Sequence, residues 1–242
     1  MKVLFTIISA VLSLALAAGS AAIVYFASGV VYLIIYIALC LVMFPLSGYL
    51  HELGHVIAGG VSGMKVSIIK TNMFSSAACS VSPKRGGNIR RRFIITALGG
   101  LAINLLFVIF GVIALCVPAI NGVFSFTAPS SLYFLLLNIF PAEYAGGKTD
   151  MLTVAEAAKN EPTAQVLMAV LEIQGEVAAG KPLAEVEEDR ILNLPQLPED
   201  DYNFAMLTSL RYQYYFEKGD RKTADVYYKR LRGLGYTDKD FK

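Results

Sequence analysis

The 242-residue chain is 55% hydrophobic and has a mean hydropathy of +0.55, which excludes an ordinary soluble domain. Its formal charge is only +2, and no Asp, Glu, Lys or Arg lies between Lys2 and His51 or between Arg92 and Glu143. Each of these runs is about fifty residues long, enough for two helices of about 20 residues across a hydrocarbon core of about 30 Å. We therefore expect an all-α membrane protein with about four transmembrane helices, a small cytoplasmic β-hairpin and a C-terminal soluble helical domain.

The first apolar segment, residues 3–27, is predicted to be a membrane span. Within it, residues 14–22 also resemble the end of a secretory signal peptide, because small residues lie where cleavage would occur. The apolar character continues past that point, which favours a retained span over removal of residues 1–22. With either outcome the next segment starts outside the cytoplasm.

The second span, residues 29–58, contains the only two histidines of the chain, in the pattern His-Glu-x-x-His. On a helix this spacing places His51 and His55 on one face, one turn apart, where both imidazoles can bind the same Zn²⁺ ion. Glu52 is offset around the helix and is suited to act as a general base on a water molecule. The alternative is a histidine pair that merely ends a membrane helix at the interface. An acidic residue inside a span is costly without a role, which argues against that alternative.

The polar connection between the second and third spans is predicted to lie in the cytoplasm. Two extended stretches, residues 64–69 and 77–82, predict a small β-hairpin beside the histidine motif. Its edge either pairs with an extended peptide by strand addition or serves as a plain connection. Residues 56–142 contain seven basic and no acidic side chains, which indicates the cytoplasmic face by the positive-inside rule. Because these charges are tied so closely to the membrane, no nucleic-acid partner is expected.

The third span, residues 93–117, contains Asn104 on a face of small residues, and this side chain is predicted to hydrogen bond to another helix. The three cysteines show no spacing typical of metal ligands, and we expect no disulfide framework.

The fourth span is predicted to run over residues 131–150 with a break, because the apolar part at 131–140 is too short to cross alone. The break brings Asp150 to about the depth of the histidine pair. Thr149 and Asp150 can cap the helix that resumes at residue 151.

From residue 151 the composition becomes that of a soluble helical protein, so we predict two domains, residues 1–150 and 151–242. The second domain has weak similarity to tetratricopeptide repeats in its last, tyrosine-rich hairpin, although such arrays need about three repeats. A packed helical cap and a surface that binds a protein partner both fit this pattern. Helices are expected at residues 163–179, 183–194, 203–218 and 221–232.

With these elements placed, residues 29–155 resemble the site-2 protease family of intramembrane zinc metalloproteases. The matching features are the His-Glu-x-x-His motif at a span's cytoplasmic end, the stretch from Gly99-Gly100 to Asn104, and Asn138-x-x-Pro141 leading to Asp150. The spacing between the Asn-Pro pair and the aspartate is longer than in the family, and Met151 stands where a glycine is usual, so Glu143 stays open beside Asp150 as the third ligand. The glycines just before Asp150 and the helix that starts there favour Asp150. The resemblance implies that His51, His55 and Asp150 bind zinc. It also implies that Glu52 activates a water molecule and that Asn138 positions the substrate.

The resemblance implies an endopeptidase that cuts a membrane-embedded or membrane-adjacent protein near the cytoplasmic face. We expect an integral protein of a bacterial cytoplasmic membrane, with its active site towards the cytoplasm and a cytoplasmic C-terminus. The alternative is a non-catalytic membrane scaffold that binds a protein partner through its C-terminal domain, and the acidic residue between the histidines argues against it. A transporter fits poorly, because outside the metal motif the spans carry no ionisable residue for an ion pathway.

Overall fold

The structure is a computed structural model that describes residues 2–72, 75–117, 122–144 and 147–236, with only the backbone described at 69–72 and 75–79. The connection between the two predicted extended stretches and the segment that follows the predicted third span lie partly outside these residues. Contacts divide the chain into two compact units. One unit contains residues 1–62, 66–81 and 94–155, and the other contains residues 63–65, 82–93 and 156–242.

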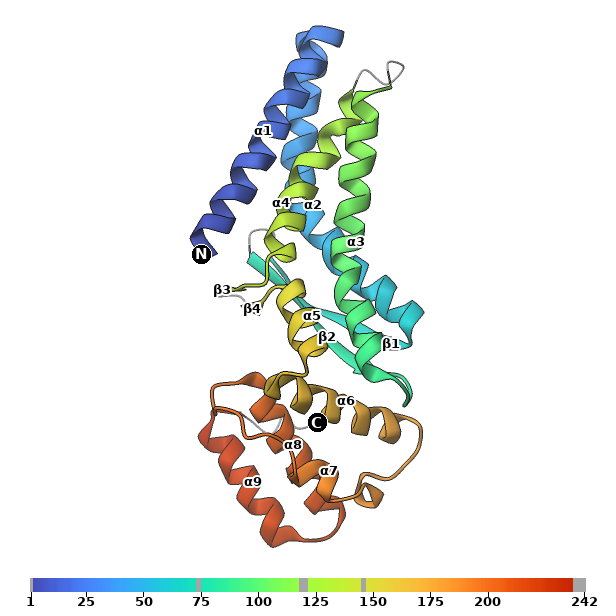
Figure 1. The fold of residues 1–242 in the computed structure, drawn as a ribbon, viewed down its shortest axis with the longest axis vertical. Coiled ribbons are helices and arrows are strands. Elements are labelled where there is room, and N and C mark those ends of the chain that lie inside the picture. The colour runs from blue at the N-terminus through green and yellow to red at the C-terminus, as the bar shows by residue number, and fades with distance from the viewer. Residues whose placement is uncertain (1, 73–74, 118–121, 145–146, 237–242) are drawn as a thin grey trace. The chain divides into compact units, whose positions relative to one another are not determined.

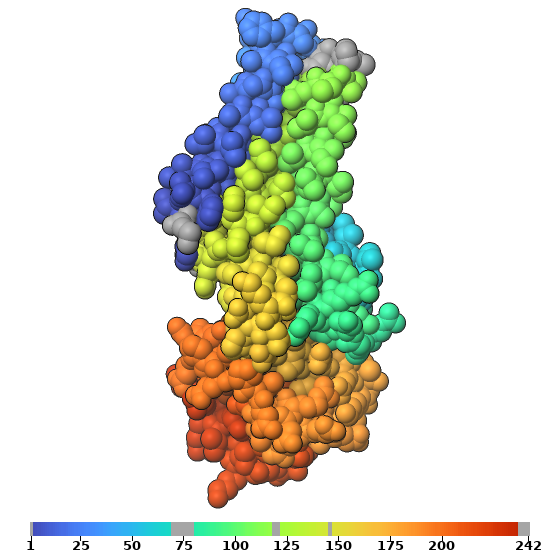
Figure 2. Space-filling view, viewed as in Figure 1, coloured from blue at the N-terminus to red at the C-terminus, as the bar shows by residue number. Residues whose placement is uncertain are grey.

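The first unit is built from long apolar helices, drawn in blue to green in Figure 1. Within the described residues, three helices are long and apolar enough to cross a membrane, and their mean hydropathies are 2.3, 2.5 and 2.5. They are α1 (Lys2–Ser28), α2 (Val30–Ser62) and α3 (Ile89–Leu115). Many of their leucine, isoleucine, valine and phenylalanine side chains are exposed, as expected for helices that face lipid. Figure 2 shows one face of these helices, coloured by residue number.

The predicted fourth span begins with a shorter helix, α4 (Thr127–Ile139), which follows the 3₁₀ turn η2 (Val123–Phe126). With 13 residues, α4 does not have the length of a crossing helix, so three of the four predicted spans meet the length requirement. The helix packs against α1 and α2. Its first turn carries buried hydroxyls, and Ser130 accepts a hydrogen bond of 2.9 Å from Ser47 of α2.

The predicted break after the fourth apolar segment is present. α4 ends at Ile139, and the short strands β3 (Glu143–Tyr144) and β4 (Gly147–Lys148) pair antiparallel before α5 (Asp150–Lys159) begins. Thr149 fixes this reversal, because its hydroxyl donates to the Phe140 carbonyl at 2.9 Å and accepts from the Ala142 amide at 3.1 Å. The freed backbone groups of the break are thus satisfied within the protein.

The predicted hairpin is also present and is longer than expected, with β1 (Met64–Asn72) paired to β2 (Ser75–Pro83). α2 continues four residues past its predicted end at residue 58. It stops at Ser62, and Gly63 follows with a φ of 84°. A glycine in this left-handed conformation commonly ends a helix.

The second unit contains the C-terminal helices. Helices predicted at 163–179, 203–218 and 221–232 are confirmed as α6 (Pro162–Ala178), α8 (Tyr202–Glu217) and α9 (Arg221–Gly233). The helix predicted at 183–194 is wrong in extent, since only the turns η3 (Leu183–Glu185) and α7 (Asp189–Leu192) form there. One hydrophobic cluster joins these elements, and its fully buried members include Val166, Ile173, Ile191 and Tyr214.

Candidate metal centre

The centre lies where α2 and α3 touch through glycine. A Cβ atom added to Gly54 would lie 2.4 Å from the Gly99 carbonyl oxygen, and one added to Gly99 would lie 2.3 Å from the Gly54 oxygen. Only glycine allows two backbones to approach this closely. The crossing therefore brings the following turn of α3 directly over the histidines of α2.

His51 and His55 occupy one face of α2, as their spacing predicts. Their exposed fractions are 5% and 7%, and their Nε2 atoms are 3.3 Å apart. Glu52, exposed by 9%, lies between them, and these three residues each place a possible ligand atom within 4.8 Å of the other two. A buried carboxylate and two imidazoles form a donor set that suits a divalent cation.

The first residue of α5 completes this cluster. Asp150 Oδ2 lies 3.0 Å from His51 Nε2, and Asp150 Oδ1 lies 3.4 Å from His55 Nε2. Although it is buried and close to an imidazole nitrogen, Oδ2 has no hydrogen-bond partner among the described residues. Two imidazole nitrogens and one carboxylate thus lie within 3.0–3.4 Å of one another.

The three separations can be compared with the geometry of zinc. Ligand bonds of about 2.0–2.1 Å in a tetrahedron place neighbouring ligand atoms about 3.3 Å apart. The two nitrogens and the carboxylate oxygens of this cluster are separated by 3.0, 3.3 and 3.4 Å. The distance between the two nitrogens, and the distance from each nitrogen to its nearer Asp150 oxygen, thus match those between neighbouring ligands of a tetrahedral site.

Gly100 keeps the space beside the imidazoles free. A Cβ atom at this position would lie 2.5 Å from His51 Cε1 and 2.7 Å from His55 Nε2. The side chain of any other residue at this position would therefore occupy the space beside the two rings.

The outer nitrogens of both imidazoles are held by α3. His55 Nδ1 lies 2.9 Å from the Thr96 carbonyl oxygen, and His51 Nδ1 lies 2.9 Å from the side-chain amide of Asn104. The prediction that Asn104 bonds to another helix agrees with this contact. Thr96 could not have been found from the sequence, since it acts through its backbone, which every residue type offers.

Two other predicted residues lie outside the cluster. Asn138 donates its amide hydrogen to the Phe134 carbonyl of its own helix at 3.1 Å and is half-buried. Glu143 is exposed on β3. Of the two candidate carboxylates, Asp150 is the one that contacts the histidines.

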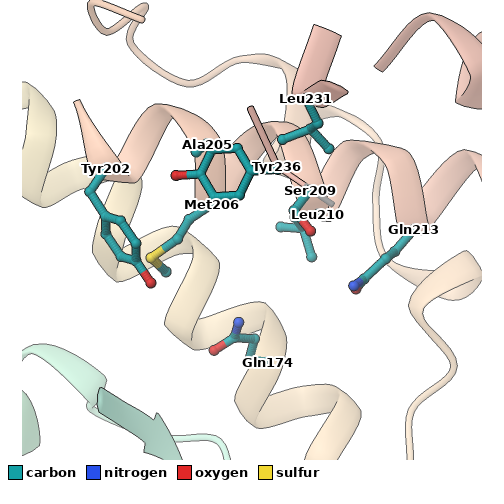
Figure 3. Close-up of a pocket in the computed structure, with 9 residues that line it drawn as sticks. All are labelled: Gln174, Tyr202, Ala205, Met206, Ser209, Leu210, Gln213, Leu231 and Tyr236. Carbon is teal, nitrogen blue, oxygen red and sulfur yellow. The ribbon is translucent and has the colours of Figure 1, made fainter. Parts of the chain in front are cut away.

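A pocket in the second unit is a different kind of site (Figure 3). Its volume is about 150 Å³, and Gln174 of α6 faces Tyr202 and Met206 of α8 across it. Among the described residues, no carboxylate, histidine, cysteine or basic side chain lines this pocket, so these lining residues lack the groups for acid–base or metal chemistry. Its remaining lining residues are Ala205, Ser209, Leu210, Gln213, Leu231 and Tyr236.

Comparisons of the chain with protein families, with characterised proteins and with solved structures found no match. In the residues that the structure describes, the chain is a membrane protein with three apolar helices and a buried His-Glu-His group that can bind a metal ion.

Proposed function

We propose that this chain is an intramembrane zinc endopeptidase, similar in its catalytic parts to the site-2 protease family. The observation that carries the proposal is the convergence of His51, His55 and Asp150 at tetrahedral separations next to the buried carboxylate of Glu52. Ionisable groups buried within a membrane span are costly, and they mark functional sites.

The chemistry follows from the donor set. Zinc, when bound, supplies a Lewis acid that polarises a carbonyl and makes water acidic enough to lose a proton near neutral pH. Glu52 is the neighbouring carboxylate outside this ligand set, and it would take that proton while the water oxygen bonds to the scissile carbonyl carbon. When the C–N bond breaks, Glu52 returns the proton to the amine nitrogen, so one water is consumed and the enzyme is unchanged.

The substrate would be a membrane-embedded or membrane-adjacent protein segment. A helical segment hides its carbonyls in backbone hydrogen bonds, so it must unwind before cleavage. The β1–β2 hairpin offers an edge on which an unwound segment can be held extended by strand addition. We assign Asn138 the supporting role of positioning that segment, through the amide that now bonds within α4.

The setting we propose is a bacterial cytoplasmic membrane, with the cleavage site near the cytoplasmic face and the C-terminal domain in the cytoplasm. The basic side chains that flank the spans support this orientation. The partners are then a lipid bilayer, a transmembrane substrate and a soluble protein held by the C-terminal domain. The pocket of that domain is large enough for one side chain.

The test is the Glu52→Gln variant, which keeps the shape of the side chain and removes the base. Membranes from cells that produce the native chain should contain new protein ends within or beside transmembrane segments, as mapped by mass spectrometry of N-termini. We expect Glu52→Gln to remove these ends, a loss of at least about 10²-fold in cleavage, while zinc stays bound. The exposed Glu172→Gln change serves as the matched control and should leave the fragment pattern unchanged.

A non-catalytic scaffold is the second candidate, and the uncharged pocket between α6 and α8 favours it. The same experiment separates the two functions. Identical fragments from the native chain and the Glu52→Gln variant would eliminate the protease and leave the scaffold.

A further inference from the structure

The outer nitrogen of an imidazole decides what its inner nitrogen can do. An imidazole binds a metal through a nitrogen that carries a lone pair, so in the neutral ring the proton must be on the other nitrogen. His55 meets this requirement through α3. The Thr96 carbonyl, 2.9 Å from His55 Nδ1, can only accept, so His55 Nδ1 carries the proton and its Nε2 is left free.

His51 faces Asn104 instead of a carbonyl. The Asn104 side chain is completely buried, and one end of its amide lies 2.9 Å from His51 Nδ1. With the NH₂ group at that end, Nδ1 would have to accept, and in the neutral ring the proton would move to Nε2, the atom that faces Asp150. In that orientation Asn104 Oδ1 is also buried without a hydrogen-bond partner in the described part of the chain.

The two ends of an amide have the same shape, and their assignment follows from the hydrogen bonds they can make. Rotation by 180° places Asn104 Oδ1 against His51 Nδ1, where it accepts the proton. His51 Nε2 then presents its lone pair to the same point as His55 Nε2. This is the orientation that a metal site requires.

We propose that Asn104 is a positioning residue of the metal centre: its Oδ1 accepts a hydrogen bond from His51 Nδ1–H and so directs the Nε2 lone pair at the ion. This inference rests on the proposed zinc site and adds to it a residue that touches neither metal nor substrate. Partners of this kind, when removed, lower metal affinity by about 10–100-fold.

The sequence of α3 supports this role, because Thr96, Gly100 and Asn104 recur every four residues and lie on one face of the helix. The Thr96 carbonyl holds the outer nitrogen of His55, Gly100 leaves room for both rings, and Asn104 holds the outer nitrogen of His51. The backbone contact of Gly54 and Gly99 fixes this face over the histidines. One stripe of α3 thus orients both imidazoles.

The experiment measures Zn²⁺ affinity of the full-length chain in detergent by competition with a chromophoric chelator. Asn104→Leu removes the acceptor at similar size, whereas Asn104→Asp keeps an acceptor of the same shape and has no donor. We expect Asn104→Leu to weaken zinc binding by about 10–100-fold. The zinc affinity of Asn104→Asp should stay within about threefold of the native value. The control is Thr127→Val, which removes another hydrogen bond to α3, from the hydroxyl of the buried Thr127 to the Phe107 carbonyl, and should leave the affinity unchanged.

Three results would overturn the proposal. Native affinity in Asn104→Leu shows that the contact is not needed, and equal losses in Leu and Asp show that the amide donates instead of accepting. A loss in Thr127→Val as large as that in Asn104→Leu shows a general packing effect. If the Leu variant does not fold, the Asp variant decides alone, since an amide that donates predicts the same 10–100-fold loss there.

The measurement also separates this proposal from the proposed function. A native chain that binds no zinc would overturn the metal centre and Asn104 together. A native chain that binds zinc, with a Leu variant that binds equally well, would overturn the role of Asn104 alone.

Discussion

Asp150 reaches the histidines because Thr149 holds the chain in place immediately before it. The Thr149 amide donates to the Ala142 carbonyl at 2.9 Å, and its hydroxyl bonds to the backbone on the far side of the hairpin. α5 then starts at Asp150, so the aspartate sits on a rigid helix end and not in a loop. A ligand placed in this way needs little reorganisation to bind an ion.

Asp150→Asn should therefore abolish tight zinc binding. The amide keeps the size of the carboxylate but removes the negative charge and one of the three converging ligands, so we expect affinity to fall by more than about 100-fold. Glu143→Gln makes the same chemical change at the exposed alternative carboxylate and should bind zinc as the native chain does. Chelator competition on the two variants provides the measurement, and a loss confined to Glu143→Gln would reverse the assignment of the third ligand.

At the residue scale the sequence predicted what depends on local spacing. The histidines lie on one face because residues four apart on a helix always do, and that follows from the helix alone. The approach of Asp150 was predicted from the break in the fourth segment and is present at 3.0 Å. The contacts of Thr96 and Gly100 depend on how α3 crosses α2, and no local pattern encodes them.

At the scale of elements, two adjacent glycines of α3 have different neighbours. Gly99 faces the backbone of α2, where an added Cβ would lie 2.3 Å from the Gly54 oxygen. Gly100 faces the tips of the imidazoles, which are the far ends of side chains and can rotate away. The first glycine serves the packing of two helices, and the second serves the metal centre.

The variants Gly99→Ala and Gly100→Ala should consequently fail in different ways. Gly99→Ala forces the helices apart, and we expect it to lower the free energy of unfolding by about 1–3 kcal/mol or more, as overpacking does. Gly100→Ala should unfold at nearly the native denaturant concentration but lose zinc binding, because its methyl group displaces both rings. Unfolding in mixed detergent and zinc titration of each variant measure the two effects.

Equal loss of stability in both glycine variants would contradict this division. Normal zinc affinity in Gly100→Ala would also contradict it, since the imidazoles would then tolerate a methyl group beside them.

The extent of the elements was predicted less well than their order. Hydropathy located α1, α2 and α3, yet α2 runs on to Ser62 through the two glycines at residues 59 and 60. Gly59 packs there against Val66, which would lie 2.4 Å from an added Cβ, so tertiary contact outweighs the weak helix preference of glycine. In the second unit, the stretch 183–194 forms short turns because its apolar residues Leu183, Val186 and Ile191 all enter the common core.

At the scale of the whole molecule, composition predicts that the two parts of the chain have different surroundings, lipid for the first and water for the second. The first unit exposes large apolar side chains along its helices, whereas the α6–α9 region gathers its own side chains into an internal cluster. The first pattern suits lipid and the second suits water. Hydropathy and charge predict a boundary at residue 150 without any knowledge of packing, because both are sums over many residues, and that boundary stays a prediction.

The orientation of the protein in the membrane can be tested with its own cysteines. Cys116 is exposed just beyond α3, a helix of 27 residues whose length of about 40 Å exceeds the hydrocarbon core. Cys79 belongs in sequence to the basic connection that the positive-inside rule assigns to the cytoplasm. In intact cells, a membrane-impermeant maleimide should label a variant whose single cysteine is Cys116. A variant whose single cysteine is Cys79 should be labelled only after the cells are permeabilised. The reverse pattern would put the basic connection and the histidine end of α2 on the outer face, and the proposed cytoplasmic cleavage could not occur there.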